Sequence, residues 1–144
     1  MNKQRVLFIC VHNSGRSQMA EAYLKNFAGD DYEAESAGLE PATEINPLVV
    51  ETMKEEGIDI SGNKIQSVFE LFKTGELYDH VVTVCDSVHE AKCPVFAGIT
   101  KRWNWPFPDP AAVDGTKEEK LQQVREIRNM IKNKLLGAIE NHFE

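Results

Sequence analysis

A cysteine and an arginine with five residues between them mark the segment of this sequence that is best suited to chemistry. The segment lies between an apolar run and a helical pattern. Backbone N–H groups of a tight loop and of a helix N-terminus converge on an oxyanion there, and the helix dipole favours negative charge. An arginine adds a planar, two-pronged donor for a tetrahedral oxyanion. The sequence therefore predicts that Cys10 is followed by an oxyanion-binding loop consisting of Val11, His12, Asn13, Ser14, Gly15, Arg16 and Ser17.

The same field acts on the thiol of Cys10. We expect this thiol to be ionised near neutral pH, which makes it a nucleophile. Gly15 permits close approach of the backbone, and the side chain of Asn13 can hold the loop through hydrogen bonds. Ser17 is placed to donate to the thiolate and to cap the helix. The alternative is a buried strand-end cysteine with a surface arginine, which the placement between a strand and a helix disfavours.

Two more cysteines allow several interpretations. Three cysteines are an odd number for a secreted disulfide framework. In a reducing compartment they can be reactive thiols, metal ligands or core residues. Cys85 ends a β-branched run, whereas Cys93 lies in a polar stretch that looks poorly placed for core packing, which favours a functional role. Because Cys85, His89 and Cys93 are spaced by four, a zinc site that uses Cys10 as a fourth ligand is a competing interpretation.

An acidic residue on a proline-rich segment completes the candidate chemistry. Asp109 lies between Pro108 and Pro110, and prolines at this density require a loop. A carboxylic acid on such a loop can protonate a departing oxygen. Taken alone, Asp109 could also be a simple turn residue.

The elements that must position these residues alternate along the chain. Apolar and β-branched runs predict strands at 5–11, 32–37, 80–85 and 99–103. Helical spacing of apolar residues predicts helices at 18–28, 46–57, 68–72 and 117–142. This order predicts one domain over residues 1–144, an α/β fold with a doubly wound, mostly parallel sheet. Ligands bind beyond the carboxyl ends of strands in such sheets, where Cys10 and Cys85 lie.

The net charge and the length of the apolar runs limit which partners and which location we expect for this protein. The formal net charge of −7 argues against a nucleic acid or an anionic membrane as partner, because both require a clustered positive field. The apolar runs are too short to span a bilayer, and the N-terminus carries no cleavage site of a signal peptide. We therefore expect a cytoplasmic protein whose anion site is built locally.

The segment CVHNSGRSQMAEAYL, at 10–24, resembles the active-site loop of the low-molecular-weight protein tyrosine phosphatase family. More narrowly, it resembles the thioredoxin-coupled arsenate reductases of that family. The similarity extends to residues 36–38, 46–47, 57–61 and 109–110. It implies a flavodoxin-like three-layer sandwich with a four-stranded parallel sheet. It also implies that Cys10 is the nucleophile, Arg16 the oxyanion ligand and Asp109 the general acid.

Cys85 and Cys93 distinguish the arsenate reductases of this family from its tyrosine phosphatases. Residues 81–94 resemble the redox segment of the reductases. The resemblance implies reduction of arsenate through a Cys10-Cys85-Cys93 disulfide relay, which thioredoxin regenerates. It also implies that phosphate or sulfate can bind as substrate analogues and that the protein acts in arsenic detoxification. Asp109-Pro110 continues as Ala111-Ala112, without the tyrosine typical of the phosphatases. A tyrosine phosphatase remains the alternative, and a weak phosphatase side activity is compatible with reduction.

Further expectations concern motion, ions and assembly. A disulfide requires Cα atoms within about 7 Å, so we expect the segment between Cys85 and Cys93 to loop out on oxidation. The resemblance implies potassium binding beside the loop, at Asn13, Glu21 and Ser36, although Gln66 occupies the position expected for an acidic ligand. We expect no other bound cofactor, and a monomer. Gly15 stands where the reductases often carry a cysteine.

Overall fold

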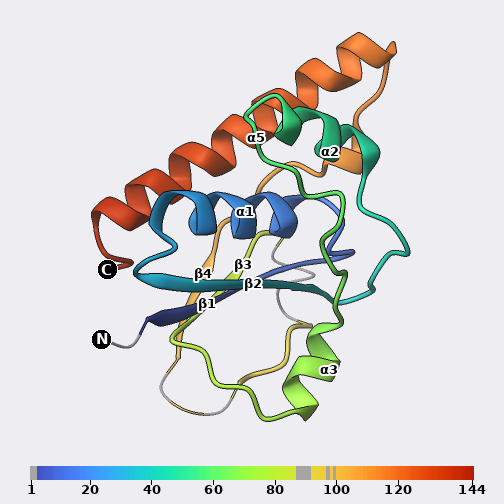
Figure 1. Cartoon of the computed structure of the whole chain (residues 1–144). Helices are drawn as coiled ribbons and strands as arrows, with labels where there is room; N and C mark the ends of the chain where they lie inside the picture. The colour runs from blue at the N-terminus through green and yellow to red at the C-terminus, as the bar shows by residue number, and fades with distance from the viewer. Residues whose placement is uncertain (1–2, 87–91, 97, 99) are drawn as a thin grey trace.

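A parallel sheet flanked by helices on both faces forms the protein (Figure 1). The computed structural model describes residues 3–86, 92–96, 98 and 100–144. The strand order is β2-β1-β3-β4, and all three pairings are parallel. The strands are β1 (Gln4–Cys10), β2 (Tyr32–Gly38), β3 (His80–Thr83) and β4 (Lys101–Asn104). The helices are α1 (Arg16–Ala28), α2 (Pro47–Lys54), α3 (Val68–Lys73), α5 (Lys117–Glu140) and the 3-10 helix η1 (Pro110–Ala112).

Helices α1, α2 and α5 lie on one face of the sheet, and α3 lies on the other (Figure 1). The predicted α/β fold with a four-stranded parallel sheet is therefore confirmed. Strand β1 lies between β2 and β3 and is buried from Val6 to Cys10, as expected for a central strand covered on both faces. Because β1 and β3 run parallel, their carboxyl ends meet at one edge of the sheet, which brings Cys10 and Cys85 to the same edge.

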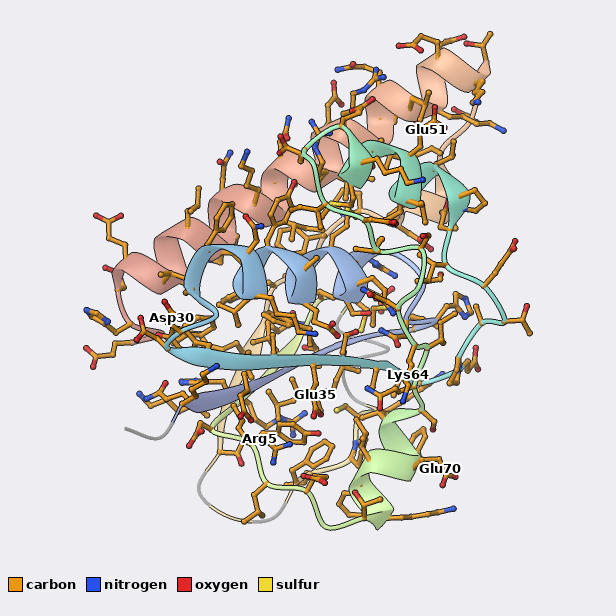
Figure 2. All side chains as sticks on the ribbon, viewed as in Figure 1. Arg5, Asp30, Glu35, Glu51, Lys64 and Glu70 are labelled. Carbon is orange, nitrogen blue, oxygen red and sulfur yellow. The ribbon has the colours of Figure 1, made fainter. Side chains whose placement is uncertain are left out.

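Two hydrophobic clusters form the core, because alternate side chains of β1 point to opposite faces. Val6, Phe8 and Cys10 belong to the larger cluster, which includes α1 and α5 residues such as Met19 and Ile131. The smaller cluster contains Leu7 and Ile9 of β1 together with Val68 of α3. On this second side, Arg5 and Glu35 form an ion pair at 3.3 Å between the guanidinium and the carboxylate (Figure 2).

The expectation that Cys93 is poorly placed for core packing is wrong. Its side chain is only 7% exposed, and it packs in the smaller cluster with Leu39, Tyr78 and Phe96. The local sequence does not reveal this, because the partners of Cys93 come from distant parts of the chain.

The last helix, α5, starts at a capping box and is followed by a tight turn of the chain. Thr116 and Glu119 form a capping box at the start of α5, where each side chain binds the backbone N–H of the other residue. After α5, His142 and Phe143 adopt positive φ, and the chain turns back on itself. Phe143 is thereby buried against an aromatic group consisting of Tyr32, His80, Trp103 and Trp105. In the described part of the chain, no helix combines the length and the apolar character needed to cross a bilayer.

Candidate active site

Hydrogen bonds from residues 39–46 to its carbonyl groups hold the loop between β1 and α1 in place. The N–H groups of Leu39, Glu40, Ala42 and Asn46 donate to the carbonyls of Cys10, Val11, His12 and Ser14, in that order. The carbonyls of the loop are therefore occupied by the neighbouring segment. Asn13 adopts a φ of 53°, and its N–H turns to the thiol of Cys10, with 3.1 Å between N and Sγ. The loop thus bonds these carbonyls to the neighbouring segment and turns the N–H of Asn13 toward Cys10.

A chain of directed hydrogen bonds ends on Cys10. The N–H of Gln66 donates to Asn13 Oδ1 at 2.9 Å, which fixes the orientation of that amide. Asn13 Nδ2 then donates to Ser17 Oγ at 2.8 Å, and Ser17 Oγ lies 2.9 Å from Cys10 Sγ. The hydroxyl of Ser17 accepts from Asn13, so its own proton is directed at the sulfur. The sulfur of Cys10 therefore has two hydrogen-bonding neighbours, the N–H of Asn13 and the hydroxyl of Ser17.

The contacts predicted for Asn13 and Ser17 are therefore present, but the predicted capping role of Ser17 is wrong. The N-cap of α1 is Gly15, without a side-chain cap. Ser17 lies inside the first turn of α1, and its hydroxyl is engaged with Asn13 and Cys10.

Arg16 connects the loop to the proline-rich segment. Its guanidinium is buried, and Nη1 donates to the carbonyl of Phe107 at 3.1 Å. Nη2 lies 4.0 Å from Asp109 Oδ2, and the side chain of Asp109 is 43% exposed. Asp109 Oδ1 accepts the N–H of Ala111 and so caps η1. The carboxylate is therefore held beside the arginine while it keeps access to solvent.

A small cavity joins these groups. Pro110 covers the loop closely, because a Cβ added to Gly15 would lie 3.2 Å from Pro110 Cγ. The Asn46-Pro47 pair starts a helix, as the sequence predicts, and Asn46 also lines this cavity, which the sequence did not predict. The cavity is lined by Cys10, His12, Ser14, Gly15, Arg16, Asn46, Asp109, Pro110 and Ala111. The structure thus gathers Cys10, Arg16 and Asp109, the three residues that the sequence singled out, around one cavity.

Cys85 lies next to this site in a different electrostatic environment. It is fully buried one residue beyond Val84, whose N–H donates to Ile9 of β1. Burial and, to a smaller extent, the charge on Cys10 raise the pKa of Cys85 and Arg16 lowers it, which gives a pKa of about 11. These influences show that Cys85 is electrostatically coupled to the site. At neutral pH Cys85 is therefore a thiol.

Cys93 lies in the smaller core cluster, away from the cluster that contains Cys10. All three cysteines are thiols, and none is joined in a disulfide. Residues 87–91 lie outside the described residues, so the expected looping-out of the segment falls on a part of the chain that the structure does not describe. The same holds for His89 and hence for the zinc interpretation.

The model of the family described as low molecular weight phosphotyrosine protein phosphatase matches residues 5–142. The chain belongs to this family. An arsenate reductase of Halalkalibacterium halodurans is 42% identical over 132 residues, which cover 91% of each chain. A solved arsenate reductase in its oxidized state has a TM-score of 0.79 and 27% identity, over 96% of this chain and 98% of that one. The thioredoxin-dependent arsenate reductase of Corynebacterium glutamicum has a TM-score of 0.62 and 34% identity, over 94% of this chain and 63% of that one.

The residues expected to bind potassium do not fit that ion in this structure. Ser36 Oγ donates to one oxygen of Glu21 at 2.7 Å, and the ammonium of Lys25 lies 2.8 Å from the other. Asn13 Oδ1 accepts the N–H of Gln66, and Gln66 presents its Nε2 donor to the carbonyl of Ser36. The oxygens that would bind a cation already face protein donors, one of which is positively charged. We therefore assign potassium no part in the chemistry of this family member.

Gln18, to which the sequence assigned no role, holds the loop through a hydrogen bond to Asn13. This side chain is fully buried, and its Nε2 donates to the carbonyls of Asn13 and Lys64. Its Oε1 accepts from Asn63. The role follows from the burial of this amide, because buried polar groups require partners, and that burial is decided by tertiary packing.

Proposed function

We propose that this protein reduces arsenate to arsenite. The observation that carries the proposal is a second buried thiol, Cys85, at the end of the strand beside the Cys10 loop. A phosphatase of this family requires only the loop, because water can attack its phosphocysteine. A reductase must supply two electrons, which two thiols provide when they form a disulfide. The arsenate reductases that cover most of this chain support the same conclusion.

In the first step, the Cys10 thiolate attacks the arsenic atom of arsenate. Arg16 and the N–H groups of residues 11–17 bind the remaining oxygens, where their positive ends stabilise the growing charge. Asp109 donates a proton to the departing oxygen, which leaves as water. Its position beside Arg16, with access to solvent, supports this role. The product is an arsenic(V) adduct on the sulfur of Cys10.

In the second step, the thiolate of Cys85 attacks the sulfur of Cys10. The sulfur–sulfur bond forms as the sulfur–arsenic bond breaks, and the bonding pair stays on arsenic. Arsenic(V) becomes arsenic(III), and arsenite leaves. Cys93 then attacks the sulfur of Cys85, which releases the Cys10 thiolate and leaves a Cys85–Cys93 disulfide. An external dithiol, for which we propose thioredoxin, reduces this disulfide. We propose a cytoplasmic monomer that acts in arsenic detoxification.

The test is NADPH consumption that depends on arsenate, in the presence of thioredoxin and thioredoxin reductase. The wild type should turn over continuously, whereas Cys93→Ser should stop after about one arsenite per protein, because its Cys10–Cys85 disulfide cannot be passed on.

Since Cys93 is buried, hydrolysis of p-nitrophenyl phosphate by Cys93→Ser serves as the folding control. It requires only Cys10, Arg16 and Asp109. If the wild type hydrolyses this ester but consumes no NADPH with arsenate, the protein is a phosphatase and the reductase proposal is wrong.

A further inference from the structure

Asn104, the last residue of β4, binds the chain on both sides of Val84. Its Nδ2 lies 2.8 Å from Thr83 Oγ1 and 3.2 Å from the carbonyl oxygen of Cys85. A weaker contact of 3.4 Å joins it to the carbonyl of Thr83, which accepts the N–H of Trp105 at 2.8 Å. The two hydrogens of the Asn104 amide therefore serve Thr83 Oγ1 and the carbonyl of Cys85.

The orientation of this amide is fixed by its neighbours. Thr83 Oγ1 donates its own proton to the carbonyl of Trp103 at 3.2 Å. It therefore acts as an acceptor toward Asn104, which requires the nitrogen of the amide, and not its oxygen, to face β3. The same nitrogen then points at the carbonyl of Cys85. Neither an aspartate nor an aliphatic side chain could supply this donor.

The bond to Cys85 lies where the regular sheet ends. Val84 is still held by backbone bonds on both sides, from its N–H to Ile9 at 2.8 Å and from the N–H of Phe107 to its carbonyl at 3.4 Å. The next carbonyl, that of Cys85, is held by a side chain. Beyond it the chain leads to Cys93, which packs in the other core cluster. Asn104 thus anchors the last position before the segment that joins the two relay cysteines.

We propose that Asn104 is a positioning residue that keeps Cys85 aligned for its attack on Cys10. This inference rests on the proposed function. The backbone bonds of the sheet end at Val84, and the bond from Asn104 extends this support to the carbonyl of Cys85. With its carbonyl held, Cys85 keeps its sulfur directed at Cys10 for the attack. Alignment matters because a displacement of about 1 Å at a reacting atom costs on the order of a hundredfold in rate.

The experiment compares two rates in the same variants. Asn104→Leu and Asn104→Asp both keep the size of the side chain and remove the donor. We expect arsenite release in a single turnover to fall about tenfold or more, the equivalent of one lost hydrogen bond. Hydrolysis of p-nitrophenyl phosphate should change less than about twofold, because a defect confined to Cys85 leaves the loop intact. Asn129→Asp, an exposed α5 position, is the matched control and should change neither rate.

Each other outcome has a distinct meaning. If Asn104→Leu releases arsenite as fast as the wild type, the positioning role is wrong. The role is also wrong if only Asn104→Asp is slow, because the added charge then accounts for the effect. If both rates fall together in both variants, Asn104 supports the fold in general and the inference fails. A wild type that releases no arsenite would instead refute the proposed function.

Discussion

At the scale of single residues, two neighbouring thiols differ because of what surrounds each sulfur. Cys10 receives the N–H of Asn13 and the hydroxyl of Ser17, both of which stabilise a negative charge. Cys85 is buried, and the charge on Cys10 further disfavours its ionised form. This difference sets the order of the proposed reaction, in which Cys10 attacks first and Cys85 second.

The pH dependence of arsenite release follows from the Cys85 thiol. Burial raises the pKa of Cys85 to about 11, so only a small fraction is ionised at neutral pH. Below that pKa, the thiolate fraction increases about tenfold per pH unit, and the thiolate is the attacking form. We expect the single-turnover rate of arsenite release to rise steadily from pH 7 to pH 9. Quenched-flow measurement of arsenite checks this, and a rate that is constant over the range would contradict it.

At the scale of elements, α5 is fixed to the rest of the protein at its start and along its length. The capping box of Thr116 and Glu119 satisfies N–H groups that the first turn leaves without partners. Further along, the buried Arg128 donates to the carbonyl of Thr52 and to Glu55, which joins α5 to the end of α2. These contacts hold α5 against the helical layer that covers Cys10.

Removal of the cap should therefore weaken the helix without touching the chemistry. We expect Thr116→Ala to lower the free energy of unfolding by about 1 kcal/mol, a usual cost of a lost N-cap. Urea denaturation followed by circular dichroism measures this change. Thr116→Ser keeps the hydroxyl and serves as the control. Equal stability of the alanine variant and the wild type would show that the capping box contributes nothing.

At the scale of the whole molecule, the first and the last thiol of the proposed relay lie in different core clusters. Cys10 belongs to the cluster on the side of α1 and α5, whereas Cys93 belongs to the cluster on the side of α3. In the proposed relay these two thiols do not react with each other, because Cys85 passes the disulfide from Cys10 to Cys93.

The C-terminus also contributes to the stability of the whole molecule. The ring of Phe143 lies 5.0 Å from the ring of His80 and 5.2 Å from that of Tyr32, so it closes the aromatic group next to β3 and β4. We expect Phe143→Ala to lower the free energy of unfolding by about 3 kcal/mol, as for other buried phenylalanines. Urea denaturation tests this. Phe27→Ala, at a partly exposed position on α1, should cost clearly less, and an equal cost would contradict the argument.

The sequence by itself determined the features that depend on neighbouring residues. A strand followed by the Cys10 loop and a helix is a local pattern, and its hydrogen bonds and dipole arise within a short stretch of chain. The alternation of strand and helix patterns likewise determined the parallel sheet. A parallel sheet then brings the ends of its strands together, which placed Cys85 beside Cys10.

Only the tertiary structure decided the features that join distant parts of the chain. The burial of Cys93, the bond from Asn104 to Cys85 and the bond from Ser36 to Glu21 each depend on side chains brought together by folding. Arg16 meets the carbonyl of Phe107 across 91 positions of sequence. Periodicity describes which face of an element is buried, but not which polar atom it meets there. Such contacts are set by the packing of whole elements, and for that reason they became visible only in the folded protein.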